Sequence, residues 1–315
     1  MHLLIPFAFC NSEGCRQVLP TLKLPHLEKL LRRLSAEPLD AGSEASLSAP
    51  HERALARALD LPVEDGLIPL AAWQAQALQA APAGAAAWAF ITPCHWQAGT
   101  KQVAMSTTLS QFSAPASQTL LVAMQPYFEE DGITLYYDQP DRWLACGAAF
   151  KGLATASLDR VAGRSVAHWL PNTPGAIPLQ RLQSEMQMLL YNHPVNDARA
   201  AQGLATVNSF WISGTGALAP ARCRPATELA PPTLVATLRT AALSEDWAAW
   251  AQAWQALDST ECAALLSALA RGESSQLTLC GERNAQTFKV QSRSLLNRIR
   301  HLLDSDRAAT VLEQL

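Results

Sequence analysis

Two neighbouring runs decide how this sequence is interpreted: His193-Pro-Val-Asn-Asp-Ala-Arg199 and, after Gly203, Asn208-Ser-Phe-Trp-Ile-Ser-Gly-Thr-Gly216. They bring a His, two Asn, an Arg and a glycine-rich turn into a short stretch of chain. A guanidinium binds phosphate or carboxylate through paired hydrogen bonds, and a glycine turn lets backbone N–H groups approach an anion. The pattern therefore predicts a small-anion site centred on Arg199.

Structural explanations for the same polar residues stay open. Asn196 can act only as the cap of a short helix, because Asn is favoured at helix N-termini. Arg199 would serve only the fold if it paired with Asp197 or Asp159. The sequence alone does not choose between a ligand role and these local roles.

The composition describes a globular chain without a strong charge bias. Of 315 residues, 49% are hydrophobic and 16% are charged, and the formal net charge is −3. This length suits two domains, or one large core that carries an inserted lobe. So small a net charge favours neither nucleic acid nor a membrane surface as a partner.

Cysteine usage and the first residues predict a cytoplasmic protein. The seven cysteines are odd in number and scattered, which is typical of reduced, mostly buried thiols. The run 1–10 is apolar, lacks a basic segment and is interrupted by Pro6, so we expect a buried strand there and no signal peptide. The Ala-rich run 80–91 contains Pro82 and Gly84 and is too short to span a bilayer.

Hydrophobic periodicity and turn residues predict an alternation of helices and strands, which favours the α/β class. The expected helices cover 22–34, 51–61, 120–127, 182–190, 243–257 and 295–303. The expected strands cover 1–10, 88–92, 133–137, 142–145, 208–213, 276–280 and 287–291, with 103–105 beside 88–92. Pro194 is expected to end the helix before it, Gly203 to end the next one, and Asp258 with Glu261 to cap the helix that ends at Gly272.

The region before and through the opening runs resembles a known enzyme family. Residues 155–171 read Thr-Ala-Ser-Leu-Asp-Arg-Val-Ala-Gly-Arg-Ser-Val-Ala-His-Trp-Leu-Pro. They are collinear with a pattern of Pro-His-Asp-Ile, then Gly-Lys, then aromatic-Leu-Pro, and the leucine-rich helix and the run 193–216 continue it in order. About residues 152–217 therefore resemble the substrate domain of the archaeal-type, cofactor-independent phosphoglycerate mutases.

This resemblance implies that a phosphorylated three-carbon acid would lie beside a set of polar and glycine residues. The candidate ligand-binding residues are Asp159, Arg164, His193, Asn196, Arg199, Asn208, Gly214 and Gly216. The sequence departs from the family pattern at three places: Pro-His-Asp is replaced by Ser157-Leu158-Asp159, Gly-Lys by Gly203-Leu204, and Trp-Gly-x-Gly by Ser213-Gly-Thr-Gly216.

The sequence lacks the motifs that bind metal ions in these mutases. Their alkaline-phosphatase-type core uses two divalent ions, which clamp the attacking and leaving oxygens of phosphoryl transfer. The N-terminal ligand motif Asp-Gly-x-x-Asp is matched only by Glu64-Asp65-Gly66-Leu-Ile-Pro69, which lacks the second carboxylate. The C-terminal third contains no Asp-His-Gly run and has His301 as its single His. We therefore predict no metal and no other cofactor, and assign no catalytic residue.

Three weaker signals in the sequence each have a simpler structural explanation. Cys94 and His95 follow an expected strand and form a weak pocket candidate. Together with Cys10 and Cys15 they would bind zinc only if the fold brought all four residues together. Their spacing is better explained by buried free thiols. The Trp residues at 247, 250 and 254 would form either a partner-binding stripe or, as their spacing favours, part of a core. The basic side of the last helix is typical of a solvated face.

The whole chain resembles the RpfE-type regulatory proteins, a bacterial family often described as phosphoglycerate-mutase-like. The resemblance is carried by Ser48-Ala-Pro-His-Glu-Arg53, Phe90-Ile-Thr-Pro-Cys-His-Trp96, Glu185-Met-Gln-Met-Leu-Leu-Tyr191 and Asn208–Gly216. It implies an α/β fold with a degenerate alkaline-phosphatase or phosphoglycerate-mutase-like core and an inserted substrate-type lobe. Residues 1–150 and 233–315 would build that core, 151–217 the lobe and 218–232 a Pro-rich linker.

The leading hypothesis is a regulatory pseudoenzyme that binds a small phosphorylated or carboxylated metabolite without turning it over. One alternative is an active phosphoglycerate mutase-like isomerase, phosphotransferase or phosphatase, so the question of enzyme activity stays open. The other is a protein–protein interaction module with a protein partner. Neither a nucleic-acid partner nor a membrane is expected.

Overall fold

The computed structural model describes residues 1–78, 86–99, 102–106, 109–218, 231–290 and 307–315. The chain divides into two compact units, each a mixture of sheet and helices, so the chain is a mixed α/β protein. Unit 1 comprises residues 1–45, 49–59 and 231–315, and unit 2 comprises 46–48 and 60–230. The first division therefore lies near residue 60 and not near 150, because the strands between 88 and 146 pair with a strand from 209–216.

Unit 1 is built on a five-stranded sheet that joins the two ends of the sequence. Its strands are β1 (His2–Ile5), β2 (Ser35–Ala36), β9 (Thr233–Leu234), β10 (Gln276–Cys280) and β11 (Ala285–Lys289). They lie in the order β2-β11-β10-β1-β9. β1 is parallel to both of its neighbours, while β10 and β11 form an antiparallel hairpin. The expected strand over 1–10 is thus much shorter than the apolar run that predicted it.

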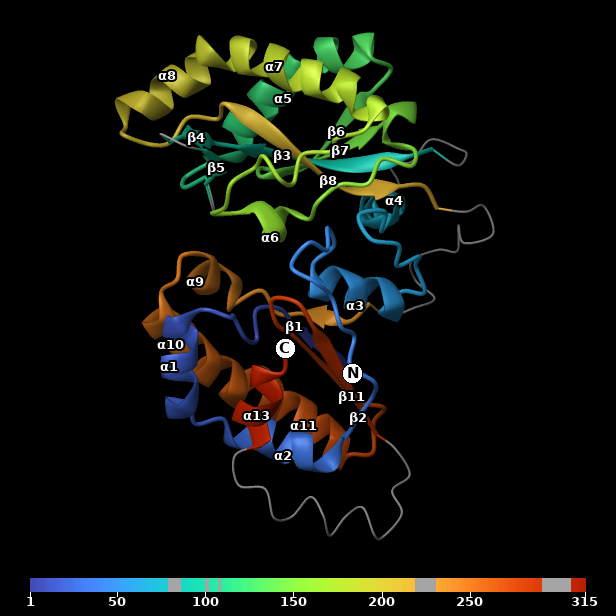
Figure 1. Ribbon diagram of the computed structural model, residues 1–315, viewed down its shortest axis with the longest axis vertical. Coiled ribbons are helices and arrows are strands. Elements are labelled where there is room, and N and C mark those ends of the chain that lie inside the picture. The colour runs from blue at the N-terminus through green and yellow to red at the C-terminus, as the bar shows by residue number, and fades with distance from the viewer. Residues whose placement is uncertain (79–85, 100–101, 107–108, 219–230, 291–306) are drawn as a thin grey trace. The chain divides into compact units, whose positions relative to one another are not determined.

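One face of this sheet is covered by helices that form the larger core of unit 1 (Figure 1). The helices of this unit are α1 (Glu13–Val18), η1 (Leu19–Thr21), α2 (Pro25–Arg33), α3 (Pro50–Ala58), α9 (Arg239–Leu243), α10 (Trp247–Leu257), α11 (Ala263–Ala270) and α13 (Arg307–Glu313). Leu3, Ile5 and Phe288 point into this core. Residues alternate between the two faces of a strand, and α3 covers part of the opposite face through Ala54 and Leu55.

The Trp residues of α10 belong to the core of unit 1, as their helical spacing predicts. Trp250 and Trp254 are fully buried, and their indole N–H groups donate to the backbone oxygens of Phe7 and Ala8. Trp247 is partly buried and packs edge-on against Trp250. A docking face made of these three rings is therefore ruled out.

Asp258 caps a helix other than the one that the sequence predicted. The segment Asp258–Cys262 is a π-helical turn that links α10 directly to α11, so no new helix begins there. The buried Asp258 carboxylate instead accepts hydrogen bonds from the backbone N–H of Leu27 at 2.7 Å and of His26 at 3.2 Å, and contacts the His26 ring at 3.0 Å. It thereby satisfies the orphan donors at the start of α2.

Unit 2 contains a four-stranded antiparallel sheet in the order β6-β7-β3-β8. Its strands are β3 (Trp88–Cys94), β6 (Thr134–Gln139), β7 (Arg142–Cys146) and β8 (Ser209–Gly216). The expected hairpin of 133–137 with 142–145 is confirmed as β6–β7. β5 (Val103–Met105) pairs with β4 (Trp96–Ala98) in a separate two-stranded sheet and not with β3, which corrects the prediction for 103–105.

Helices cover both faces of the unit 2 sheet, with α5, α7 and α8 on one side and α4 and α6 on the other (Figure 1). They are α4 (Leu70–Ala77), α5 (Ala114–Glu130), η2 (Ala148–Phe150), α6 (Leu158–Val161), η3 (Pro174–Ala176), α7 (Ile177–Tyr191) and α8 (Pro194–Ala201). Ala89 and Ile91 of β3 face the larger core, whereas Trp88 and Phe90 face the smaller one. Both faces are therefore covered, which explains why six of the seven residues of β3 and seven of the eight residues of β8 are buried.

Two sequence predictions fall on parts of the chain that are not described. The helix expected over 295–303 lies outside the described residues, and so does most of the linker expected over 218–232. Among the residues that are described, none forms a helix both long and apolar enough to cross a membrane.

Candidate functional site

The residues of the opening motif begin with a short helix that His193 caps. α7 ends at Tyr191, and α8 starts at Pro194, whose fixed φ angle suits the first helical position. The His193 ring Nδ1 accepts a hydrogen bond from the backbone N–H of Val195 at 3.2 Å. The cap predicted at Asn196 is therefore wrong, because His193 occupies that position and Asn196 lies inside the helix.

Asn196 uses its amide to join three backbone groups. Its Nδ2 donates to the carbonyl oxygens of Leu190 at 2.8 Å and Val207 at 2.6 Å, while its Oδ1 accepts from the Val207 N–H at 2.8 Å. The side chain is 4% exposed. A buried amide with these partners fixes the segment after α8 against the end of α7, and it offers little to a ligand.

Arg199 is held by backbone carbonyls and not by a carboxylate. Its Nε donates to Ala205 O at 2.8 Å, and its two terminal nitrogens donate to Gln111 O at 3.3 Å and Ser110 O at 3.0 Å. The guanidinium carbon of Arg199 also lies over the Phe112 ring, 5.4 Å from its centroid, as a cation–π contact. Within the described residues it forms no ion pair with Asp159 or Asp197, and burial lowers its pKa.

The side-chain amide of Asn208, next to the start of β8, bonds to the backbone of Trp96 as a neighbouring strand would. Its Oδ1 accepts from the Trp96 backbone N–H at 2.7 Å, and its Nδ2 donates to the Trp96 carbonyl at 2.9 Å. Its own N–H donates to Cys94 O at 3.1 Å. The side chain thus connects the end of β3, the start of β4 and the start of β8, so its hydrogen-bonding groups are engaged by the fold.

The glycines of the motif lie in a strand and not in the turn that was predicted. β8 continues through Gly216, and its pairing with β3 shifts register between Trp88 and Phe90, which is the mark of a β-bulge. Gly214 has φ +61°, and a Cβ there would lie 2.7 Å from the Phe90 ring. Between the two glycines, Thr215 donates to Leu153 O at 2.6 Å. The bulge therefore explains both glycines by backbone conformation and close packing.

Asp159 lies on α6 and Arg164 lies just after it, where residues 162–165 pair with β5. Asp159 is half-buried in the first turn of α6, where Ser157 caps the helix. Arg164 is exposed, and its backbone oxygen accepts from the Met105 N–H at 3.1 Å. Of the candidate residues, Asn196 and Arg199 therefore lie on α8, which His193 caps. Asp159 lies on a different helix, α6, and Arg164 follows that helix.

Cys94 and His95 lie at the end of β3. Burial raises the pKa of the Cys94 thiol, so it does not supply a thiolate. The His95 ring contacts Thr206 O at 2.8 Å through Nδ1. Cys10 and Cys15 belong to the other unit. In the described part of the chain, no group of three or more His, Cys, Asp or Glu could hold a metal ion.

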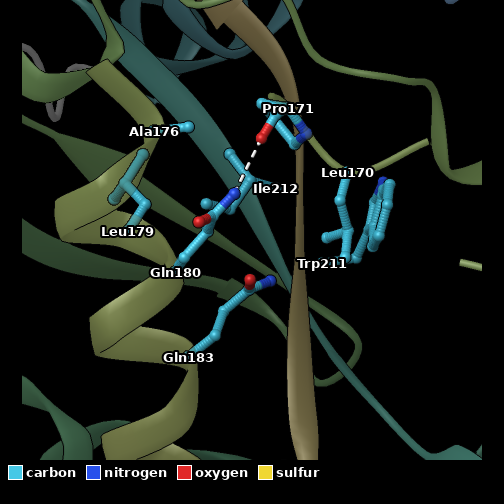
Figure 2. Close-up of a pocket in the computed structure, with 8 residues that line it drawn as sticks. All are labelled: Leu170, Pro171, Ala176, Leu179, Gln180, Gln183, Trp211 and Ile212. Carbon is cyan, nitrogen blue, oxygen red and sulfur yellow. Dashed lines mark hydrogen bonds between the residues drawn. The ribbon is translucent and has the colours of Figure 1, made fainter. Parts of the chain in front are cut away.

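A small apolar hollow in unit 2 is part of the packing and has no room for a metabolite (Figure 2). Its volume is about 10 Å³, which is close to the space that one water molecule needs. Gln180 bridges it by donating to Pro171 O at 2.9 Å, and Gln183 donates to Phe210 O at 3.1 Å. The lining residues are Leu170, Pro171, Ala176, Leu179, Gln180, Gln183, Trp211 and Ile212.

A much larger hollow, of about 400 Å³, lies against the sheet of unit 1 and contains none of the residues predicted as a site. Its polar floor comes from alternate residues of three strands, His2 in β1, Thr278 in β10 and Thr287 in β11. The signal that could have found it is a period-2 pattern of polar residues opposite apolar ones. That signal is weak, because each strand contributes only one or two of them.

Comparisons with solved structures give distant likenesses, among them the two that follow. No family model matches the chain, and the curated proteins contain no match. A cofactor-independent phosphoglycerate mutase from Thermoplasma acidophilum DSM 1728 superposes with a TM-score of 0.36 at 11% sequence identity, covering 100% of this chain and 99% of that one. The PH0037 protein from Pyrococcus horikoshii superposes with a TM-score of 0.42 at 9% identity, covering 92% and 87%. Likeness at this level assigns no activity to this chain.

Proposed function

We propose that this chain is a regulatory protein that binds a small phosphorylated or carboxylated metabolite beside Arg199 and does not convert it. The observation that carries the proposal is a buried cation whose charge no described carboxylate meets: Arg199 is 5% exposed, and carbonyls and an aromatic ring surround it. A bound anion would supply the missing opposite charge. The regulatory role follows from the resemblance to RpfE-type proteins and stands as part of the proposal.

The energetic argument concerns the charge of Arg199 and not its hydrogen bonds alone. Carbonyl oxygens satisfy N–H donors, but they carry only partial charges, and a buried ion without a counter-ion is costly. Burial lowers the Arg199 pKa, which reflects this cost. Each terminal nitrogen has a second N–H besides the one that donates to Ser110 or Gln111. A phosphate or carboxylate that reached this pair would gain a charge-assisted contact.

The chemistry around Arg199 supports binding more than turnover. Asn196 and Asn208 use both ends of their amides in backbone hydrogen bonds. The candidate thiol of Cys94 has its pKa raised by burial. A nucleophile or general base needs the opposite, a reactive group with a pKa near the working pH.

A thermal-shift screen tests the proposal in the full-length protein. Stabilisation that grows with the concentration of 2- or 3-phosphoglycerate, and not with glycerol, would support binding to the folded state. Arg199→Lys keeps the charge but loses the planar fork, so we expect it to weaken binding. The exposed Arg181→Gln is the matched control, because Arg181 pairs with Asp131 and Glu185 far from any proposed contact.

Two further measurements keep the test decisive if the Arg199 variant folds poorly. In the unaltered protein, a ligand at Arg199 should slow amide hydrogen exchange in residues 109–112 and 205, whose carbonyls surround the guanidinium. Turnover assays with Mn²⁺ or Mg²⁺ address catalysis directly. Mutase or phosphatase activity that disappears in the Arg199 variant would overturn the non-catalytic part, and silence of all the anions would overturn the binding part.

A further inference from the structure

We propose that the hollow on the sheet of unit 1 binds an uncharged molecule that carries several hydroxyl groups, of the class of monosaccharides and cyclic polyols. The hollow belongs to unit 1 and is lined by none of the residues around Arg199, so the proposal goes beyond the proposed function and does not depend on it. Three properties of the hollow support it: a polar floor, side-chain charges that balance, and a volume that suits a small molecule.

The floor of the hollow is the polar half of one face of the sheet. On the other half, Leu4, Cys280 and Ala285 form an apolar cluster with Ala54 of α3. Side chains alternate between the two faces of a strand, so every second residue along each strand lies on this same face. Towards the start of β1 and β10, these positions are polar and line the hollow: His2, Gln276, Thr278, Thr287 and Lys289. The face thus changes from a packing surface to a hydrogen-bonding surface within the hollow.

The groups of the floor both donate and accept hydrogen bonds. The His2 ring Nε2 lies 2.9 Å from Thr278 Oγ1, which lies 3.0 Å from Thr287 Oγ1. A hydroxyl donates one hydrogen bond and accepts two, so the half-buried Thr287 hydroxyl keeps capacity for a ligand. Gln276, half-buried between His2 and Lys289 in the strand register, adds an amide with donors and an acceptor. Ligand hydroxyls have the same double character.

The charged side chains beside this floor form two ion pairs. Lys289 Nζ lies 2.8 Å from Glu37 Oε2. Arg57 donates to both oxygens of Asp40, in one case at 2.8 Å. Arg53 also contacts Asp40 but does not line the hollow. Among the described residues that line the hollow, two bases therefore face two acids, and their formal charges cancel.

Balanced ion pairs favour an uncharged ligand over a charged one. The acid of each pair cancels most of the attraction that its base exerts on an anion, and the base does the same for a cation. A hydroxyl needs no separation of the pair, because it accepts from the N–H and donates to the carboxylate. The ring of His2 adds no charge at pH 7, since burial, the charge of Lys289 and the N-terminal ammonium lower its pKa to about 4.

The volume and the apolar part of the lining narrow the ligand further. About 400 Å³ lies within the range of pockets that hold small molecules. The apolar lining is aliphatic and includes Pro38, Leu39 and Ala58; apart from His2, no aromatic side chain lines the hollow in the described part of the chain. A flat nucleobase would therefore find little to stack on. A saturated ring with hydroxyl groups at its edge uses both the floor and the aliphatic lining.

Nuclear magnetic resonance of the His2 ring in the full-length protein tests the site at pH 7. The neutral probes are glucose, ribose and myo-inositol, and His2→Asn assigns the signal. Glucuronate and glucosamine place a negative or a positive charge on the glucose ring, and glycine is the zwitterion. We expect at least one neutral probe to shift the His2 signal and to saturate it in the millimolar range. The charged probes should bind severalfold more weakly, because the paired side chains do not offset the loss of their hydration.

Two substitutions connect this signal to the floor of the hollow. Thr287→Val removes the hydroxyl and Gln276→Met removes the amide, each with little change in size. Each should weaken binding of the neutral probe about fivefold, as expected for the loss of one neutral hydrogen bond to a ligand. Gln187→Met, at an exposed position of α7 in unit 2, is the matched control and should leave binding unchanged.

The possible outcomes decide between this site, a merely solvated surface and the site at Arg199. A His2 signal that no neutral probe shifts would overturn the inference, and so would binding that neither Thr287→Val nor Gln276→Met weakens. Tighter binding of glucuronate, glucosamine or glycine than of every neutral probe would overturn it as well. If phosphoglycerate slows exchange at 109–112 while the neutral probes leave His2 unchanged, the proposed function stands and this inference fails. A saturable shift at His2 without protection at 109–112 gives the reverse result.

Discussion

The segment 193–216 of unit 2 and the hollow of unit 1 use polar side chains in opposite ways. In the segment, the amides of Asn196 and Asn208 bond to the backbone and are enclosed by it. In the hollow, His2 and Thr287 bond to side chains and border open space. A motif rich in polar residues is thus no measure of a binding surface. What matters is whether its donors and acceptors are already engaged by the chain itself.

The largest effect is expected where the segment is most enclosed. Asn196→Ala leaves the Val207 N–H and two carbonyls without their partner in a buried place. The opening free energy around α8 should fall by ~3–4 kcal/mol, since each unsatisfied buried group costs about 1–3 kcal/mol. Hydrogen exchange of the Val207 amide measures it. Gln187→Ala, at an exposed position of α7, is the control. A loss below ~1 kcal/mol in Asn196→Ala would show that the amides of the segment 193–216 are no more important to the fold than the polar groups of the hollow.

The bulge in β8 gives the next largest effect. Gly214→Ala combines a left-handed φ of +61° with a contact of 2.7 Å to Phe90, so we expect a loss of ~2–3 kcal/mol. Gly203→Ala also has a left-handed φ, +69°, but its Cβ would meet nothing within 4 Å. That variant should lose only about 1 kcal/mol. Urea unfolding of the two proteins compares them, and equal losses would show that Phe90 yields.

His2, which borders the hollow, should make the free energy of unfolding depend on pH. The folded-state pKa of His2, about 4, lies below the ordinary value of 6.5, so the unfolded chain binds the proton more tightly. The stability that depends on neutral His2 is therefore complete above pH 6.5 and is lost as the pH falls towards 4. Because the ring is only half-buried, solvent limits the loss to ~1–2 kcal/mol. Unfolding of His2→Asn should lack this slope, whereas the exposed His168→Asn should keep it.

The smallest effect is expected at the floor of the hollow. Thr287→Val removes one half-buried hydroxyl from the chain with Thr278 and His2. The free energy of unfolding should change by under ~1 kcal/mol, because the Thr278 hydroxyl keeps its hydrogen bond to His2. Chemical denaturation measures the change. A loss as large as that of Asn196→Ala would mean that the hollow is a structural network like the segment.

The elements that sequence reasoning located well are those with strong local signals. Helices α2, α7 and α10 follow leucine or tryptophan spacing, and the first strand of the β6–β7 hairpin follows the alternation of residues 133–137. The bulge at Gly214 was interpreted as a turn, since a glycine with positive φ looks alike in both. The division near residue 60 was missed because it depends on which strands pair.

The candidate site shows a second limit of sequence reasoning. Arg199 and its neighbours stand close together in the sequence, which is why the pattern predicts a site there. Residue type alone could not show that carbonyls from 110, 111 and 205 would accept three of the five guanidinium N–H groups. The hollow was missed for the opposite reason. Its members, such as His2 and Thr287, are separated by most of the sequence and become neighbours only in the sheet.

The position of β1 in the unit 1 sheet has a consequence for synthesis on the ribosome. Both neighbours of β1, the strands β9 and β10, are encoded after residue 230. At about 5–20 residues per second, the first strand waits for tens of seconds before a partner emerges. Unit 2 is nearly continuous in sequence and can fold during that interval. The exposed apolar β1 is then a substrate for chaperones until the last quarter of the chain appears.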